Sequence, residues 1–302
     1  MATNTSDRPE CWPELPLSSW EATRATLHMW TQIVGKIRLG LTPLVNQWWN
    51  VPLYVTARGL TTSRIPYRER AFEMWFDFIS HELVIETSDG QVKKITLSPR
   101  SVADFYAEVM STLRSLGIDV KIWPMPVEIA NPIRFTEDHT HASYDRNAVE
   151  KFWRILLTAD AIFTEFRSRF IGKNSPVHFF WGSFDLAVTR FSGRRAPEKP
   201  GADRITQEAY SHEVSSVGFW PGNSGVIDAA FYCYASPEPQ GFKDAPAKPP
   251  EAYYGKEMGE FLLPYEAARK AQSPTEALMD FCQSTYEAAA NLAKWDRKSL
   301  ER

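Results

Sequence analysis

The sequence has little cysteine and no paired cysteine motif. Three cysteines occur in 302 residues, at positions 11, 233 and 282, and no CxxC pattern is present. This wide spacing and odd number are typical of free thiols in a reducing compartment rather than of a disulfide framework. No apolar run is long enough to span a membrane, and the polar N-terminus has no apolar signal core. The sequence therefore predicts a soluble cytoplasmic protein without a membrane partner.

The sequence also lacks an excess of charge of one sign. Its 34 basic and 37 acidic residues are interspersed and give a formal net charge of −3. Nucleic acids are bound by concentrated basic surfaces, so we expect no nucleic-acid partner. Glycine loops that hold phosphates or dinucleotides are absent, as are the GxSxG and HExxH motifs. The sequence therefore indicates no particular cofactor, metal or oligomeric state.

Aromatic residues are abundant instead. The chain has 11 Trp, 11 Tyr and 18 Phe. Large flat side chains either fill a core or line a pocket for an apolar or planar ligand. Composition leaves both interpretations open, but it makes a small molecule the partner that we expect.

Hydrophobic periodicity predicts an α+β fold. We expect a helix from Trp20 to Leu41, a second helix capped by Ser98 and Pro99 that ends at Gly117, a third over 146–170 with Asp145 or Ser143 as N-cap, and a last helix with a Ser273–Glu276 capping box. Alternating residues predict strands over 50–60, 72–79, 83–87, 92–97, 120–123, 177–191, 208–220 and 228–235.

Short segments recur in the same order in the two halves. LYVTARG (53–59) resembles LAVTRFS (186–192), SHEL (80–83) resembles SHEV (211–214), and each half ends in a Ser-Pro-capped helix containing Asp-Phe. We interpret this as a divergent duplication, with two helix–antiparallel strands–helix units related by a pseudo-twofold and packed as one globular unit. The expected divisions are an extended leader over 1–17, a first unit over 18–135 and a second over 136–302 with a Pro-rich insertion over 237–271. A ligand pocket is expected where the units meet.

The stretch HFFWGSFDLAVTRF, from His178 to Phe191, is the best candidate for the wall of a site. As one regular strand, it places His178 on an aliphatic core face and Asp185 on the opposite face, beside Trp181 and Ser183. Only a bulge at Gly182 would bring His178 and Asp185 together.

Arginines supply the candidates for anion binding. The matching strand of the first half presents Tyr54 and Arg58, and Arg58 would reach Asp185 if the two strands lie close. Such a pair is either a structural ion pair or, with Arg58 or Arg190 as donor, a clamp for a carboxylate. The predicted ligand-binding residues are Tyr54, Arg58, Trp181, Ser183 and Arg190.

The catalytic candidates are His178, Asp185, His212 and Glu213. His212-Glu213 repeats His81-Glu82, so the pair is either a turn inherited with the fold or one copy recruited to chemistry. The segment EDHTHASYD (137–145) contains an HxH pair, for which a solvated capping loop is favoured over a metal site.

A polar stripe runs along the first predicted helix. It consists of His28, Gln32 and Lys36, which recur every four residues opposite the apolar face. We expect this stripe to face solvent; a role in proton transfer would require the helix to be covered on both sides.

Several stretches together resemble an uncharacterised bacterial family, domain of unknown function 5996. They include WPELPLSSW, LHMWTQIVGK, LYVTARGLTTS, SPRSVADFY, VKIWPMPVE, SPVHFFWGSFDLAVTRFSGR, AYSHEV, GEFLLPYE and STYEAAA. The resemblance runs from about Trp12 to Arg302. It implies that the chain is one family unit, and it implies no activity, cofactor or catalytic residue.

Three functional hypotheses follow. The first is a protein that binds or transforms a small, partly aromatic or carboxylated molecule held between the two repeats. The second is a metal-dependent enzyme using His178, His212 and Glu213. The third is a non-catalytic structural or interaction protein, in which the aromatic residues only fill the core. Whether the protein is an enzyme stays open at this point.

Overall fold

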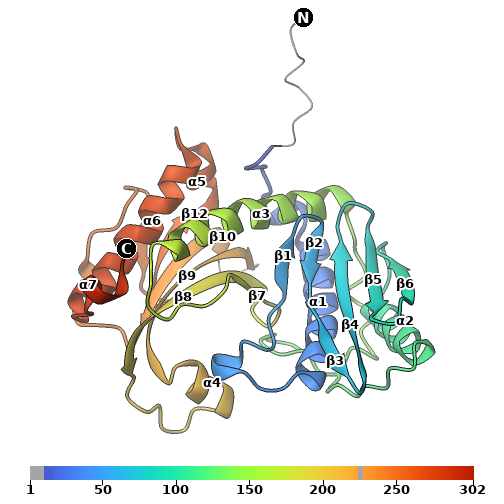
Figure 1. Cartoon of the computed structure of the whole chain (residues 1–302). Helices are drawn as coiled ribbons and strands as arrows, with labels where there is room; N and C mark the ends of the chain where they lie inside the picture. The colour runs from blue at the N-terminus through green and yellow to red at the C-terminus, as the bar shows by residue number, and fades with distance from the viewer. Residues whose placement is uncertain (1–9, 224–226) are drawn as a thin grey trace, which may run out of the picture.

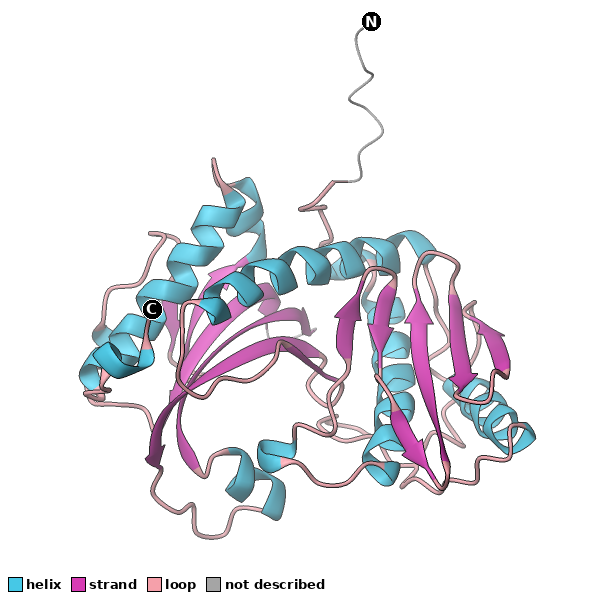
Figure 2. Cartoon of the chain, viewed as in Figure 1, coloured by secondary structure: helices cyan, strands magenta, loops and turns pink. Residues whose placement is uncertain are grey.

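Within residues 10–223 and 227–302, the computed structural model contains two antiparallel sheets and seven α-helices (Figures 1 and 2). The predicted α+β class is therefore confirmed. Helix α3 (Arg146–Ser168) runs across both sheets, and an isolated bridge between Leu53 and Phe179 joins their neighbouring edges. Its two N–H···O hydrogen bonds are both 2.9 Å long.

The first sheet has the order β1-β2-β4-β5-β6, and β3 pairs with β4. Its strands are β1 (Tyr54–Thr56), β2 (Gly59–Thr61), β3 (Ile65–Tyr67), β4 (Arg70–Asp77), β5 (Glu82–Thr87) and β6 (Val92–Thr96). Helices α1 (Glu21–Leu41) and α2 (Val102–Ser115) lie against it (Figure 1). Trp30 of α1 stacks on Phe105 of α2 with the ring centroids 4.5 Å apart, which joins both helices in one core.

The second sheet has the order β11-β12-β10-β9-β8-β7. Its strands are β7 (His178–Phe180), β8 (Asp185–Arg195), β9 (His212–Asn223), β10 (Ile227–Ser236), β11 (Tyr253–Gly255) and β12 (Glu260–Pro264). Helices α3, α5 (Tyr265–Lys270) and α6 (Pro274–Leu292) cover one face, and the short α7 (Arg297–Leu300) follows. Leu186 and Val188 are fully buried, which confirms the predicted core face of β8.

In the described part of the chain, no long helix packs directly against the opposite face of the second sheet. Helix α4 (Arg204–Ala209) and the 3₁₀ turn η3 (Asn46–Trp48) contact each other and lie across from it (Figure 1). Two further 3₁₀ turns, η2 (Leu17–Ser19) and η4 (Phe242–Asp244), complete the elements. The Pro-rich segment 237–271 does not stand apart, because it supplies β11, β12 and α5 to this half.

Several predicted elements are confirmed with small shifts. Helix α1 matches the predicted first helix, and Asp145 caps α3 by accepting hydrogen bonds from the backbone N–H groups of Asn147 and Ala148. The β4–β5 hairpin also forms as expected, with His81 at a positive φ of 56° in its turn. Trp12 anchors the leader by packing on Phe231 and Tyr265.

Other local predictions are wrong. Residues 50–60 form no single strand, because the chain turns between β1 and β2. The cap of α2 is Ser101 rather than Ser98, and its hydroxyl accepts from the N–H of Asp104 at 3.0 Å. Ser273 makes no side-chain cap, and residues 120–123 form no strand.

The predicted pseudo-twofold repeat is not shown by the strand orders, which differ between the two sheets. Ser80 and His81 lie in the turn between β4 and β5, whereas Ser211 and His212 follow α4, and His212 is the first residue of β9. The matching sequence segments thus occupy different structural contexts.

Candidate functional site

A cavity of about 1010 Å³ lies on the open face of the second sheet. Its lining draws on both halves of the chain: α1, η3 and the connector over 121–128 from the first, and the sheet with α4 from the second. Five of the eleven tryptophans contribute to it, namely Trp48, Trp49, Trp123, Trp181 and Trp220. Nearly half of the tryptophans in the sequence therefore border this cavity. Its size falls in the upper range for small-molecule sites.

Strand alternation forms the floor of the cavity. On β8, Asp185, Ala187 and Thr189 face the cavity while the residues between them face the helices. On β9, Gly218 stands between Ala187 and Tyr232 in the register of the three strands. A Cβ at Gly218 would overlap the Tyr232 ring, so only glycine lets this ring lie across β9. The tyrosine hydroxyl then reaches β8.

Asp185 is the polar centre of this floor. Its two carboxyl oxygens accept hydrogen bonds from the hydroxyls of Ser183 and Tyr232. Burial raises the pKa of Asp185 above its usual value, and the two hydroxyl donors oppose this shift in part. Burial also raises the pKa of the Tyr232 phenol, so this hydroxyl keeps its proton as the donor.

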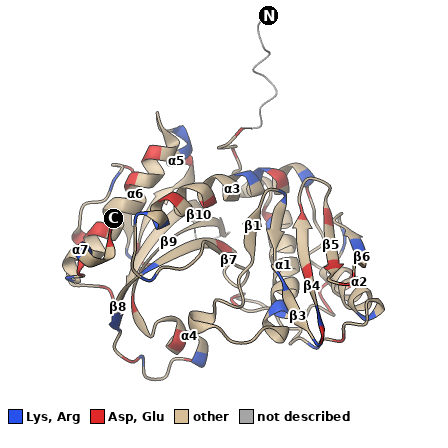
Figure 3. Ribbon diagram, viewed as in Figure 1, with Lys and Arg blue, Asp and Glu red and all other residues tan. Residues whose placement is uncertain are grey.

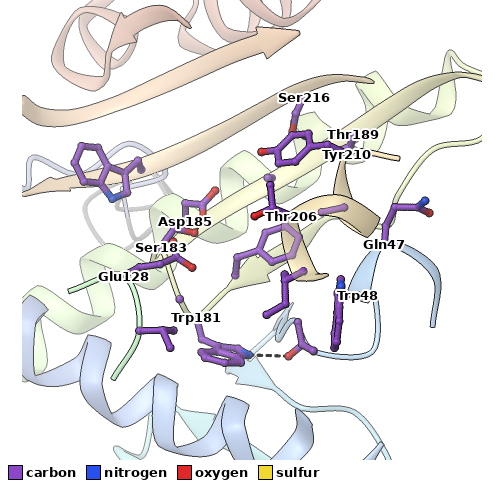
Figure 4. A pocket seen from close by; sticks show the side chains of 18 of the residues that line it. Gln47, Trp48, Glu128, Trp181, Ser183, Asp185, Thr189, Thr206, Tyr210 and Ser216 are labelled. Atoms are coloured by element: carbon purple, nitrogen blue, oxygen red, sulfur yellow. Dashed lines mark hydrogen bonds between the residues drawn. The ribbon is translucent and has the colours of Figure 1, made fainter. Parts of the chain in front are cut away.

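Two further carboxyl groups face the same space. Burial and the neighbouring Asp185 raise the pKa of Glu128, and the same two causes raise the pKa of Glu260 to about 7. Within the described chain, none of these three carboxyl groups forms an ion pair. Figure 4 shows Glu128, Ser183 and Asp185 gathered on one side of the cavity, across from Gln47 and Trp48. A carboxylate on this side of the cavity accepts hydrogen bonds from a ligand, and a protonated carboxyl can also donate one.

Lys36 of α1 contributes a buried amine to the cavity wall. Its residue is 6% exposed, and burial lowers the pKa of the ammonium group to about 8. The nitrogen lies 5.0 Å from the ring centroid of Trp123 and 5.9 Å from that of Trp181. Trp181 packs against α1 at Gly35, where a Cβ would overlap the indole, and its Nε1–H donates to the Val51 carbonyl at 2.8 Å (Figure 4).

The polar stripe on α1 does not face solvent, so that prediction is wrong. His28, Gln32 and Lys36 are all buried, because the 121–128 connector and the β7–β8 turn cover the helix on this side. Gln32 forms two 2.8 Å hydrogen bonds with the backbone of Val127. His28 Nε2 lies 2.8 Å from the Gly182 carbonyl, and burial lowers the pKa of His28 to about 4. The ring is therefore neutral and can donate this bond.

The stretch from His178 to Phe191 is a hairpin rather than one strand. The chain turns through residues 181–184, with Phe184 at a positive φ of 62°, and His178 pairs with Ala187 across the two strands. Cross-strand partners share a face, so His178 and Asp185 are on one face and not on opposite faces as predicted. His178 nevertheless lies outside the cavity lining, against Trp49 and Tyr54.

Three predicted site residues line the cavity: Trp181, Ser183 and Asp185. Tyr54 packs on His178 instead. Arg58 does not reach Asp185, because its Nε lies 2.6 Å from Asp77 on the first sheet.

Arg190 lies on the helix-covered face of the second sheet. Its guanidinium carbon stands 3.4 Å from the Phe166 ring centroid, and the group donates to the Phe166 carbonyl. His212 contacts the Ser211 hydroxyl at 3.0 Å, and Glu213 pairs with Arg194 at 2.6 Å. These predicted residues therefore do not meet at one site.

The described residues contain no group of three His, Cys, Asp or Glu side chains that could hold a metal ion. His178, His212 and Glu213 are not brought together as the metal hypothesis requires. The HxH segment is a turn: Asp138 is buried, contacts His141 Nδ1 at 2.7 Å and accepts the backbone N–H groups of Thr140 and His141.

Sequence reasoning missed three polar cavity residues, Glu128, Tyr232 and Glu260, and it expected a fourth, Lys36, to face solvent. The available signal for Lys36 was its place in the stripe with His28 and Gln32, which gains a role only if the helix is covered on both sides. Glu128 lies in a connector without periodicity, and Glu260 and Tyr232 reach the cavity only through the strand order. Figure 3 shows acidic and basic residues interspersed over the elements, so net charge could not have located the site either.

The fold and the cavity define an α+β protein with a ligand-sized, aromatic and carboxyl-lined cavity on one sheet face. None of the helices in the described part of the chain is long and apolar enough to cross a membrane. The chain belongs to the family of unknown function DUF5996, whose model matches residues 12–302. No curated protein and no solved structure matches the chain.

Proposed function

We propose that this protein binds, as a receptor or as an enzyme, a small organic molecule with a flat, partly aromatic body in the cavity on the second sheet. The observation that carries the proposal is the cavity itself, with about 1010 Å³ of space and five tryptophans in its lining. Indole rings offer large rigid contact surfaces to planar ligands at little cost in side-chain entropy. The hydroxyl-bonded Asp185 and the carboxyl of Glu260 supply the few polar groups that orient a ligand.

The other two hypotheses have less support. A metal-dependent reaction would need a cluster of ligands, and the three proposed residues lie apart within the described chain. A purely structural role would need all five of these tryptophans in the core. Only Trp181 is buried there; the other four are partly or largely exposed and border the cavity. The small-molecule proposal needs no metal cluster, and it gives the tryptophans at the cavity a role.

The first test is native mass spectrometry of the freshly purified protein, compared with its denatured mass. We expect an added mass from a co-purified molecule, or binding of planar aromatic compounds in a ligand-detected NMR screen. Thr189 on β8 lines the cavity, so Thr189→Phe places a ring on its floor, narrows it and should weaken binding at least about tenfold.

The matched control is Thr96→Phe, which places the same side chain on the exposed face of β6 in the first sheet. This variant should bind like the wild type. The proposal fails if the protein carries no molecule and binds none of the compounds, or if Thr189→Phe binds them as tightly as Thr96→Phe.

A further inference from the structure

Lys36 is a largely buried lysine whose nitrogen is open to the cavity and has no polar partner among the described residues. Its residue is 6% exposed, it borders the cavity, and within the described chain its ammonium group makes no hydrogen bond or ion pair. Lysine is almost never buried to this extent unless an opposite charge accompanies it, because the lost hydration must be replaced. The missing counter-charge is the feature that needs an explanation.

The surroundings of Lys36 show what is lacking. Two indole rings flank the ammonium group, those of Trp123 and Trp181, and cation–π attraction replaces only part of its hydration. Lys121 in the same lining adds a second positive charge. Within the described chain, none of the three cavity carboxyls forms an ion pair with Lys36. Asp185 is bonded to Ser183 and Tyr232 instead.

From this arrangement we infer that the ligand carries a carboxylate, which binds the Lys36 ammonium group between the Trp123 and Trp181 rings. The inference rests on the proposed function and names its substrate class: planar, partly aromatic carboxylic acids. The proposed anion-binding residue is therefore Lys36 on α1, and not Arg58 or Arg190 as predicted from the sequence.

A carboxylate fits this position better than a phosphate. Phosphate sites usually combine several donors, such as an arginine fork or the N–H groups at a helix N-terminus, and here the buried donor is a single amine. Glu128, Asp185 and Glu260 also face the cavity, and they repel a dianion more strongly than a monoanion. The second negative charge would therefore work against binding.

Matched acid and amide probes test the inference. The pairs are 3-phenylpropanoate with 3-phenylpropanamide, and indole-3-propanoate with indole-3-propanamide; phenyl phosphate is the fifth probe. Dissociation constants are measured by calorimetry and ligand-detected NMR on the whole chain. We expect each acid to bind at least about tenfold more tightly than its amide, as for a charge-assisted hydrogen bond in a buried site.

Three variants locate the effect. Lys36→Met keeps most of the apolar length of the side chain and removes its charge, so the preference for acid over amide should fall to about one. Lys36→Arg keeps the charge and should retain a preference. Lys93→Met, on the exposed strand β6, is the matched control and should bind like the wild type. Circular dichroism confirms that each variant is folded.

The outcomes separate this inference from the proposed function. If the amides bind as tightly as the acids, the cavity is a ligand site and the carboxylate inference is wrong. If Lys36→Met keeps the preference for acids, the anion lies elsewhere and the inference is also wrong. Tighter binding of phenyl phosphate than of both acids overturns the choice of carboxylate. If neither acids nor amides bind to the folded protein, the proposal of a planar aromatic ligand fails with it.

Discussion

Replacing His178 with phenylalanine should change how the stability of the protein depends on pH. His178 is fully buried, and neither ring nitrogen has a hydrogen-bond partner among the described residues. Burial, together with the positive charges of Arg38 and Arg167, lowers the pKa of His178 to about 3. Its ring centroid lies 5.9 Å from Trp49 and 5.5 Å from Tyr54, so an aromatic replacement meets an aromatic environment.

The magnitude follows from the difference between folded and unfolded pKa values. The folded pKa of His178 is about 3 and the ordinary value is 6.5, so the unfolded chain takes up a proton first as the pH falls. Stability that is present above pH 6.5 is therefore lost below it. At about pH 5 the loss is about 2 kcal/mol, from 1.5 pKa units at about 1.36 kcal/mol each. His178→Phe removes this loss.

Urea unfolding followed by tryptophan fluorescence, at about pH 7.5 and about pH 5, gives the free energy of unfolding of both proteins. The variant should gain about 2 kcal/mol relative to the wild type between the two pH values. A packing cost of the larger ring shifts both measurements equally and cancels. Contributions from Glu260 and His28 cancel as well, because both proteins contain them.

His139→Phe is the matched control, since His139 is exposed on a loop, where water solvates it in both states. The difference in the free energy of unfolding between His139→Phe and the wild type should be the same at both pH values. An equal pH response of the His178 and His139 variants would refute the conclusion that His178 is buried as a neutral ring, and would reopen its predicted catalytic role.

Two further predictions concern the cavity and the leader. The free energy of unfolding of Glu260→Gln should rise by roughly 2 kcal/mol relative to the wild type as the pH rises from about 5 to about 8. The pKa of Glu260 is raised from 4.5 to about 7, so its ionisation destabilises the folded wild type over this range. Urea unfolding at both pH values measures the difference, and a difference that does not change with pH would count against the burial of this carboxyl. Trp12→Ala should lower the free energy of unfolding by about 2–3 kcal/mol, since it removes the contacts with Phe231 and Tyr265, whereas an exposed leader would show no loss.

Local patterns in the sequence were enough to predict much of the secondary structure. Helix α1 has an uninterrupted apolar periodicity, and the β4–β5 hairpin combines alternation with a polar turn, so local preferences and packing agree there. The cap of α3 is also local, because Asp145 bonds to groups two and three residues ahead. These elements depend on neighbours in the sequence.

The predictions failed where the chain reverses within an apolar run. From His178 to Phe191 no proline or Asn-Gly pair marks a turn, and Phe184 takes a positive φ that favours glycine or asparagine. The strained turn is held by its surroundings, since the Phe184 ring stacks on Phe152 and packs on Phe179. A tertiary contact thus decides which face Asp185 occupies.

The candidate site depends on such contacts more than the fold does. Lys36 stands on the polar side of an amphipathic helix, where a solvated lysine is the ordinary expectation. It becomes a residue of the cavity wall only because the 121–128 connector, which has no periodic pattern of its own, pairs with Gln32 and covers that side. Trp181 then fits against Gly35 and completes the wall. Gln32 and Gly35, which position the cavity wall, are within four residues of the lysine, while their partners are far away in the sequence. The connector and Trp181 leave the Lys36 nitrogen facing the cavity, and so the proposed role of Lys36 follows from packing rather than from a motif.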